Sequence, residues 1–152
     1  PGGLLGWATF PDELAGDRVR DGVVLSFQTL PGGSGAPYNL GRTATHEVGH
    51  WFGLFHTFQG GCNGVGDQVN DTVAHSGPNF GKPTPGEAHN ACDPNEDAPV
   101  RNFMNYVDDD SMDHFTVEQG GRMREQIATF RPDLIDDSAD DISRFERIPH
   151  QH

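Results

Sequence analysis

The sequence is poor in basic residues: 10 Lys and Arg stand against 23 Asp and Glu, which gives a formal net charge of −13 at pH 7. Nucleic acids and anionic membrane surfaces would be repelled by such a chain, so we expect neither as a partner. Cationic peptides would be attracted. The sequence also lacks an apolar run near the roughly 20 residues that a membrane-spanning helix needs, so we expect no membrane insertion.

Regular hydrophobic periodicity is also scarce. The 152 residues suffice for one domain with a core, but 34% hydrophobic content and 20 glycines indicate that this domain is rich in loops. The sequence begins at Pro1 and shows no signal-peptide pattern. We therefore expect a processed or excised piece of a precursor, with any export signal upstream.

The most informative segment is residues 46–56, HEVGHWFGLFH, which follow the pattern H-E-x-x-H-x-x-G-x-x-H. On a helix, His46 and His50 lie on one face, so both imidazoles can bind the same metal ion. Gly53 can end the helix with a positive φ, and the chain then turns back so that His56 supplies a third nitrogen. Glu47 projects beside the metal, where a carboxylate can take a proton from metal-activated water.

Three histidine ligands leave a fourth position open, which is typical of a catalytic zinc site and not of a closed structural one. The alternative is that the histidines merely fill one face of a helix, as a bare H-E-x-x-H does by accident. The added glycine and third histidine at fixed offsets strongly disfavour that alternative. The sequence therefore predicts a catalytic zinc site.

Two strands are expected before this motif, at residues 4–10 and 22–30, because both segments are rich in β-branched, aromatic and aliphatic residues and are bounded by proline or glycine. A helix from about Arg42 to Phe52 should carry the zinc motif. Residues 57–100 contain no periodic segment because glycine and proline interrupt them repeatedly. So long a segment needs something other than a ladder of hydrogen bonds to hold it.

A second helix is predicted by the capping box that starts at Thr116, and it should run to about Phe130. Met123, Ile127 and Phe130 would share its core-facing side. Residues 132–152 are acidic and have little apolar periodicity, which indicates a C-terminal tail that is either disordered or ordered by docking. The preceding residues 1–131 would form the folded domain.

Cys62 and Cys92 are the only cysteines, and they bracket most of the irregular region. A disulfide between them would restrict the unfolded chain by roughly 3 to 4 kcal/mol on the loop-entropy model. The alternative is a pair of reduced, buried thiols. A disulfide would imply an oxidising, extracellular setting.

Residues 67–72, DQVNDT, bring carboxylate, amide and hydroxyl oxygens together within six positions. Calcium prefers such hard oxygen ligands and tolerates irregular geometry and main-chain carbonyls. A solvated acidic turn explains the composition equally well. The residues alone leave both possibilities open.

Met104 follows His56 by 48 residues, within the segment NFMNY. An extended zinc motif is expected to have a methionine downstream, in a tight turn that forms a hydrophobic floor under the histidines. Taken alone, Met104 would be an ordinary core methionine. The phenol of Tyr106 could reach the metal site, where a hydroxyl can stabilise the oxyanion of a tetrahedral intermediate.

The segments GRTATHEVGHW (41–51), GDQVNDT (66–72) and NFMNY (102–106) together resemble the pappalysin family of the metzincin clan, which includes ulilysin and secreted fungal metalloproteases. The resemblance covers roughly residues 4–131. It implies an α+β zincin catalytic domain, secretion and zinc endopeptidase activity. The implied roles are zinc ligands for His46, His50 and His56, general base and acid for Glu47, the Met-turn for Met104, a place beside the zinc for Tyr106, and calcium near Asp67, Val69, Asp71 and Thr72.

Two departures from the family pattern stand out. Relatives commonly carry a second disulfide whose cysteines would fall at Lys82 and Ser111, whereas Cys62 and Cys92 match the bridge that remains. Catalytic domains of the family also have further strands and a helix before the position of Leu4. We therefore expect residues 1–131 to be an N-terminally incomplete catalytic domain with a loop-rich C-terminal subdomain. An upstream fragment of the same precursor would then be a partner.

The expected function is hydrolysis of peptide bonds in protein or peptide substrates, with the strand around residues 23–27 pairing with an extended substrate. Asp110 lies six residues after Met104, and an aspartate at the matching position in relatives is associated with basic residues just after the scissile bond. Its alternative is a solvated loop aspartate. The rival function is a non-catalytic zinc-binding interaction module. Truncation favours this alternative, whereas Glu47 disfavours it.

Overall fold

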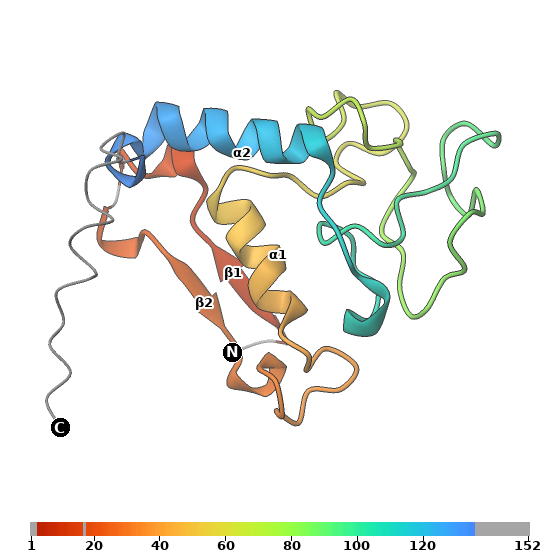
Figure 1. Ribbon diagram of the computed structural model, residues 1–152, viewed down its shortest axis with the longest axis horizontal. Coiled ribbons are helices and arrows are strands. Elements are labelled where there is room, and N and C mark those ends of the chain that lie inside the picture. Colours follow the sequence, from red (N-terminus) through yellow and green to blue (C-terminus); the bar gives the residue numbers. More distant parts are fainter. Residues whose placement is uncertain (1–2, 17, 136–152) are drawn as a thin grey trace, which may run out of the picture.

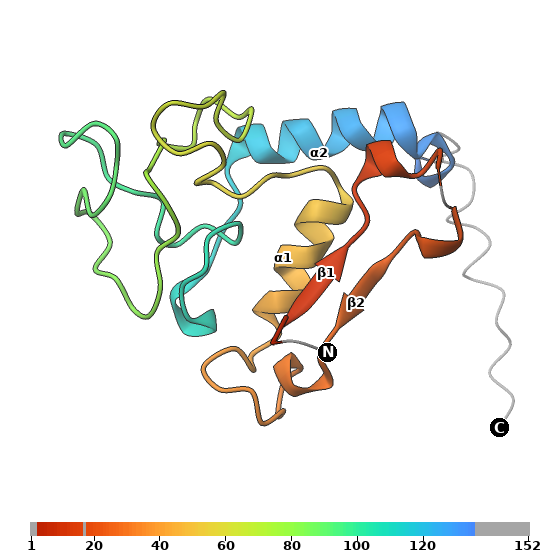
Figure 2. The same ribbon diagram turned by 180° about the vertical axis from the view of Figure 1, so that it is seen from behind.

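The structure is a computed structural model that describes residues 3–16 and 18–135. Its regular elements are strands β1 (Gly6–Ala8) and β2 (Val23–Leu25) and helices α1 (Arg42–Trp51) and α2 (Val117–Phe130), together with short 3₁₀ turns. The two strands form an antiparallel sheet in which Trp7 lies opposite Val24. The sheet packs along one side of α1, the irregular region lies on the other side, and α2 crosses one end of α1 (Figures 1 and 2). The predicted α+β class is confirmed.

Both strands are shorter than predicted. Main-chain hydrogen bonds extend the pairing slightly, because Thr9 N donates to Gly22 O at 3.0 Å and Ser26 N donates to Leu5 O at 2.8 Å. Residues 27–29 then form a 3₁₀ turn, and the Thr29 hydroxyl donates to Ser26 O at 2.8 Å. The prediction of a strand over residues 22–30 is therefore wrong at its end, because local hydrogen bonding replaces the ladder there.

Helix α1 has almost the predicted bounds. Its start is fixed by Asp109, whose carboxylate accepts hydrogen bonds from the main-chain N–H groups of Leu40 and Arg42 at 2.8 and 3.2 Å. Negative charge at this position also complements the helix dipole. The helix ends at Trp51, and Gly53 has a φ of +91°, which reverses the chain as predicted.

The described residues contain no helix that is long and apolar enough to cross a membrane. Residues 57–100, which the structure describes in full, form no helix or strand, as predicted. A disulfide joins Cys62 to Cys92 with an S–S distance of 2.01 Å and a Cα–Cα distance of 5.4 Å, which confirms that prediction. An isolated bridge between His75 and Ala91 lies beside it. The irregular region is thus closed at its base by one covalent bond and a few main-chain hydrogen bonds.

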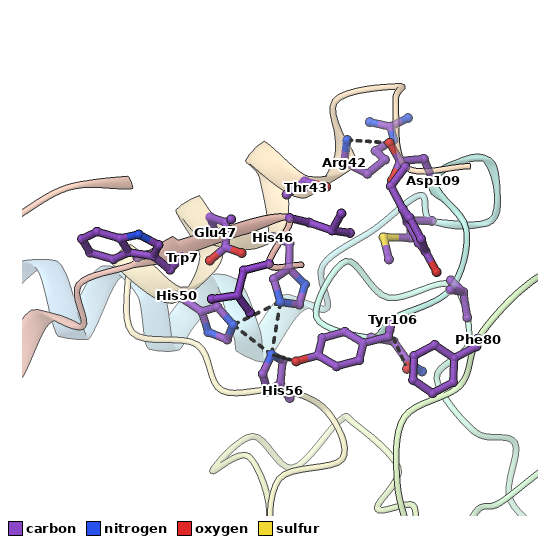
Figure 3. A pocket seen from close by; sticks show the side chains of 18 of the residues that line it. Trp7, Arg42, Thr43, His46, Glu47, His50, His56, Phe80, Tyr106 and Asp109 are labelled. Atoms are coloured by element: carbon purple, nitrogen blue, oxygen red, sulfur yellow. Dashed lines mark hydrogen bonds between the residues drawn. The ribbon is translucent and has the colours of Figure 1, made fainter. Parts of the chain in front are cut away.

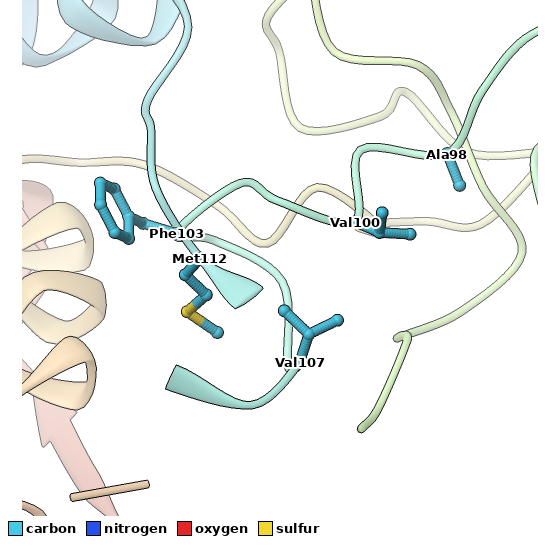
Figure 4. Packing of buried hydrophobic residues seen from close by; sticks show 5 residues of the cluster. All are labelled: Ala98, Val100, Phe103, Val107 and Met112. Carbon is cyan, nitrogen blue, oxygen red and sulfur yellow. The ribbon is translucent and has the colours of Figure 1, made fainter. Parts of the chain in front are cut away.

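A small hydrophobic core lies at the end of the irregular region and just beyond it. Its buried members are Ala98, Val100, Phe103, Val107 and Met112 (Figure 4). The core lies within the segment that surrounds the predicted Met-turn. Its packing therefore helps to hold the turn in position.

Helix α2 begins at the predicted capping box. Gln119 N donates to Thr116 Oγ1 at 3.1 Å, and Thr116 N donates to Gln119 Oε1 at 2.9 Å. Gln119 is fully buried, and its amide also exchanges two hydrogen bonds with Asn102 that compensate for the loss of water. Met123 and Ile127 are half-buried as expected, whereas Phe130 is 37% exposed. Phe130, in the last turn of α2, is therefore less buried than expected.

A buried ion pair lies at the end of α2. Arg131 Nη1 donates to a carboxylate oxygen of Asp21, and its guanidinium carbon lies 4.1 Å from the centre of the Trp51 ring. The indole N–H of Trp51 donates to Asp21 Oδ1 at 2.8 Å. This cluster joins the segment before β2, the end of α1 and the end of α2. Pro132–Leu134 form a last 3₁₀ turn, and residues 136–152 of the predicted tail lie outside the described residues.

Candidate active site

The side chains of His46, His50 and His56 converge on one point, as predicted (Figure 3). Their Nε2 atoms are 3.1 Å apart between His46 and His50, 3.0 Å between His50 and His56, and 3.2 Å between His46 and His56. A tetrahedral zinc ion with Zn–N bonds of about 2.0 to 2.1 Å places its nitrogens roughly 3.3 Å apart. Three imidazole nitrogens that lie this close together carry too few protons for each of them to form a hydrogen bond with the others. The site therefore fits a zinc ion.

Main-chain carbonyls orient two of the histidines. His46 Nδ1 lies 2.7 Å from Phe103 O, and His50 Nδ1 lies 2.7 Å from Leu54 O. A carbonyl can only accept, so each Nδ1 carries the proton and donates it, which leaves the Nε2 lone pair free for a metal. Phe58 stacks on the His56 ring at 4.8 Å and 7° and fixes the third ligand.

The histidines are held in their neutral form. Burial lowers the pKa of His46 to about 4 and that of His56 to about 3, and the proximity of His50 lowers both further. Burial also lowers the pKa of His50. Because neutral imidazole is the form that binds metal, zinc displaces no proton from these rings at neutral pH.

Glu47 lies next to the histidines, and its carboxyl packs against β1. An ideal Cβ built on Gly6 would lie only 2.8 Å from Glu47 Cγ, so a glycine is required where the strand passes this side chain. Burial raises the pKa of Glu47 to about 7. A carboxyl with this pKa can both accept and return a proton near neutral pH.

Tyr106 approaches the same point from the opposite wall. Its hydroxyl lies 3.0 Å from His56 Nε2, and the side chain is partly exposed to the cleft (Figure 3). Burial and, to a smaller extent, the charge of Glu47 raise its pKa, so the phenol keeps its proton. Tyr106 is therefore placed to donate a hydrogen bond to a substrate oxygen beside the metal position.

Met104 is fully buried and lies against α1, as predicted for the Met-turn. An ideal Cβ on Gly49 would lie 2.5 Å from Met104 Sδ, so glycine allows the helix and the turn to approach closely. Met104 N donates to Asn102 Oδ1 at 2.9 Å, and Met104 O accepts from Thr57 N at 3.3 Å. The turn is thus bonded to the segment that follows the third histidine.

A cleft of about 580 Å³ runs past the three histidines and Glu47. On one side it is lined by residues 3–8 and Phe10, and on the other by residues that include Phe80 and Tyr106. None of residues 23–27 lines it, so the expectation that this strand borders the substrate is wrong. β1 lies at the cleft, and β2 pairs with the other edge of β1.

Three of the four predicted calcium ligands have converging oxygen atoms. The Thr72 hydroxyl lies 2.8 and 2.7 Å from the two carboxylate oxygens of Asp67, and 3.1 Å from Val69 O. The Asp71 carboxylate accepts hydrogen bonds from Thr116 Oγ1 and Glu118 N at the start of α2. Calcium coordination by Asp71 therefore stays a prediction that has a competing structural role.

Asp110 is exposed and forms an ion pair with Lys82. It lies next to the cleft lining, which includes Asp109 but not Asp110. Sequence reasoning missed Gly6, Phe80 and Asp109. The signal for Gly6 is a glycine inside a predicted strand, which marks the close approach of another group.

Comparison with known proteins agrees with this geometry. A Peptidase M43 family model, described as pregnancy-associated plasma protein-A, matches residues 5–128. The "Extracellular metalloprotease" of Pyricularia oryzae is 48% identical over 134 residues, which are 86% of this chain and 46% of the relative. The "Extracellular metalloprotease 1" of Coccidioides posadasii is 47% identical over 133 residues, which are 86% of this chain and 47% of the relative. The chain thus spans about half the length of these relatives.

The similarity extends to three dimensions. Mature mirolysin of Tannerella forsythia in complex with a cleaved peptide has a TM-score of 0.73 and 40% identity, and the match covers 82% of this chain and 47% of mirolysin. A second structure, mirolysin in complex with "compound 9", has a TM-score of 0.74 and 40% identity over 84% of this chain and 49% of that one.

Proposed function

Because the chain belongs to the M43 family of pappalysin-type zinc metallopeptidases, we propose that it is a secreted, zinc-dependent endopeptidase or the catalytic part of one. The observation that carries this proposal is the convergence of three Nε2 atoms within 3.2 Å, beside a glutamic acid whose pKa is about 7. The extracellular names of the relatives and the disulfide support secretion.

The proposed mechanism assigns one role to each side chain at the site. The three histidines would hold zinc, which would supply a Lewis acid and lower the pKa of bound water toward about 7. Glu47 accepts the proton of the attacking water and returns it to the leaving amine. The Tyr106 hydroxyl donates a hydrogen bond to the carbonyl oxygen as negative charge develops there.

The exposed edge of β1 would bind the substrate main chain. In the ladder with β2, Leu5 O accepts a hydrogen bond, Thr9 N donates one, and Trp7 lies opposite Val24. The alternation of an antiparallel pair directs the main-chain groups of Gly6 and Ala8 to the other edge, toward the cleft. An extended peptide can add to that edge as a further strand. One of the similar mirolysin structures is a complex with a cleaved peptide, which supports this class of substrate.

The direct test is hydrolysis of casein and of a quenched-fluorescent peptide library by the zinc-loaded chain. We expect cleavage products at neutral pH and their loss when zinc is removed by a chelator. Bound zinc without any cleavage would favour a non-catalytic zinc-binding module. Cleavage restored by the remaining polypeptide of a longer precursor would assign the activity to the combined protein.

We propose further that calcium binds at Asp67, Val69 and Thr72. Burial raises the pKa of Asp67, and a cation beside this carboxylate would stabilise its charged form. Calcium at about 100 times its dissociation constant should stabilise the fold by roughly 2.7 kcal/mol and raise Tm by about 5 to 10 °C. Thermal melts of zinc-saturated protein at increasing calcium measure this shift. Asp67→Asn should abolish the shift, whereas an equal shift in both proteins would place calcium elsewhere.

Asp110 is proposed to favour Arg or Lys just after the scissile bond. Because Lys82 pairs with its carboxylate, a substrate cation has to compete with that lysine. We expect Asp110→Ala to lower the Arg-to-Leu ratio of kcat/KM by about 5-fold, and Lys82→Ala to raise it by a similar factor. Peptides that differ only at this position measure the ratio. A ratio that neither substitution alters would remove Asp110 from the specificity pocket.

A further inference from the structure

We propose that Phe80 binds a large apolar side chain of the substrate, on the Tyr106 side of the three histidines. This inference rests on the proposed peptidase function, because it assigns a contact within the same cleft. The chemical class of the ligand is a peptide that carries an aliphatic or aromatic residue at this position. The proposal depends on the exposure of Phe80, its place in the cleft and the fixation of its main chain.

Phe80 is 63% exposed and lines the cleft that contains Glu47 and the zinc-binding histidines. Its ring centre is 6.0 Å from that of Tyr106. Figure 3 shows Phe80 beyond Tyr106, at the opposite end of the labelled group from Trp7. An apolar ring in this place is available to any peptide that lies along the cleft past the metal position.

The residues on both sides of Phe80 are bonded to the Met-turn segment. Asn79 N donates to Asn105 Oδ1 at 2.9 Å, and Asn105 Nδ2 donates to Asn79 Oδ1 at 2.9 Å. Gly81 O accepts a hydrogen bond from Asp108 N at 2.9 Å. Asn105 is fully buried and adjoins Tyr106. The main chain that carries Phe80 is therefore fixed relative to the phenol of Tyr106.

The base of the same loop is fixed as well. Asn79 Nδ2 donates to Asn90 Oδ1 at 2.8 Å, and Asn90 Nδ2 donates to Gly77 O at 2.6 Å. The disulfide between Cys62 and Cys92 lies two residues beyond Asn90. An aromatic ring on a main chain held in this way loses little conformational entropy when a ligand covers it, which favours binding.

The ring of Phe80 defines the side chain that it accepts. Lys82, two residues along the same loop, is already paired with Asp110 of the facing segment. The ring itself offers an exposed apolar surface to the cleft. A leucine or phenylalanine side chain gains apolar contact there, whereas alanine is too short to cover the ring.

The test compares labelled peptides that carry leucine or alanine at each position flanking the scissile bond. Binding is measured by fluorescence polarisation on the zinc-loaded Glu47→Gln protein, and kcat/KM is measured on protein that retains Glu47. We expect leucine to be preferred over alanine by about 5- to 10-fold at one position. Adding Phe80→Ala should abolish that preference in both measurements, and Phe80→Leu should keep most of it.

Val65→Ala is the matched control, because Val65 is 88% exposed and does not line the cleft. It should leave the preference unchanged, and the melting temperature of each variant verifies folding. If Phe80→Ala keeps the leucine preference of the wild type at each position where it occurs, the proposal is overturned, while the peptidase function stays intact. Neither binding nor cleavage of any peptide by the chain with Phe80 intact would overturn both.

Discussion

Replacing Glu47 by glutamine should lower kcat for peptide hydrolysis by about 10³-fold. An amide has nearly the size of the carboxyl and fits beside Gly6, but it cannot accept the proton of the attacking water. Burial raises the pKa of the Glu47 carboxyl to about 7, which suits both proton transfers at neutral pH. Hydrolysis of a quenched-fluorescent peptide measures kcat, and metal analysis of the same sample measures bound zinc.

Zinc content should be unchanged in Glu47→Gln, because the metal position is formed by the three histidines. Glu125→Gln is the matched control, since Glu125 is an exposed residue of α2 and loses the same charge. It should hydrolyse the peptide as the wild type does. If Glu47→Gln retains full zinc and a kcat within a few-fold of wild type, another group is the base and the proposed mechanism is wrong.

The second large effect is expected for Tyr106→Phe, which should lower kcat by about 100-fold. This change removes only the hydroxyl, which lies 3.0 Å from His56 Nε2 and faces the cleft. A hydrogen bond that forms mainly as the oxyanion develops stabilises the transition state and not the bound substrate. KM and zinc content should therefore stay close to their wild-type values.

Tyr38→Phe provides the comparison, because Tyr38 lines the same cleft and Tyr38 and Tyr106 are the only tyrosines of the chain. We expect its kcat to remain near that of the wild type. A rise in KM with kcat unchanged would instead indicate that the hydroxyl contributes only to ground-state binding. A kcat that does not change would show that the phenol has no part in the reaction.

The zinc site could be predicted from the sequence because its geometry is local. The spacing of His46, His50 and His56 specifies one helix turn and one reversal at Gly53, and both occur. The capping box at Thr116 and the disulfide were predictable for similar reasons, since one depends on a spacing of three residues and the other on the only two cysteines.

Features that depend on long-range contacts were not predictable. The sequence did not show which strand borders the cleft, because β1 and β2 have similar composition and only the tertiary pairing places β1 next to Glu47. At the start of α1, Asp109 accepts hydrogen bonds from residues that lie 69 and 67 positions earlier in the sequence. The placement of Phe80 likewise depends on side-chain hydrogen bonds between Asn79 and Asn105, which no local pattern announces.

The two predicted acidic sites show the same limit. Asp67 and Thr72 are close in sequence, and their oxygens converge as the composition of residues 67–72 suggested. The carboxylate of Asp71, in the same segment, lies instead at the start of α2, where it accepts hydrogen bonds from residues 45 and 47 positions away. Asp110 is paired with Lys82, 28 positions away. Competing partners of this kind become visible only in the folded structure.

We propose that this chain forms one zinc site at which peptides are hydrolysed, and a zinc titration tests this claim most directly. Zinc is added in steps to metal-free protein, and peptide hydrolysis and bound zinc are measured at each step. We expect the rate to rise in proportion to bound zinc and to reach its maximum at one ion per chain. His50→Ala should show neither zinc binding nor hydrolysis. One bound zinc ion per chain, held by the three histidines but without hydrolysis of any peptide in the library, would contradict the claim.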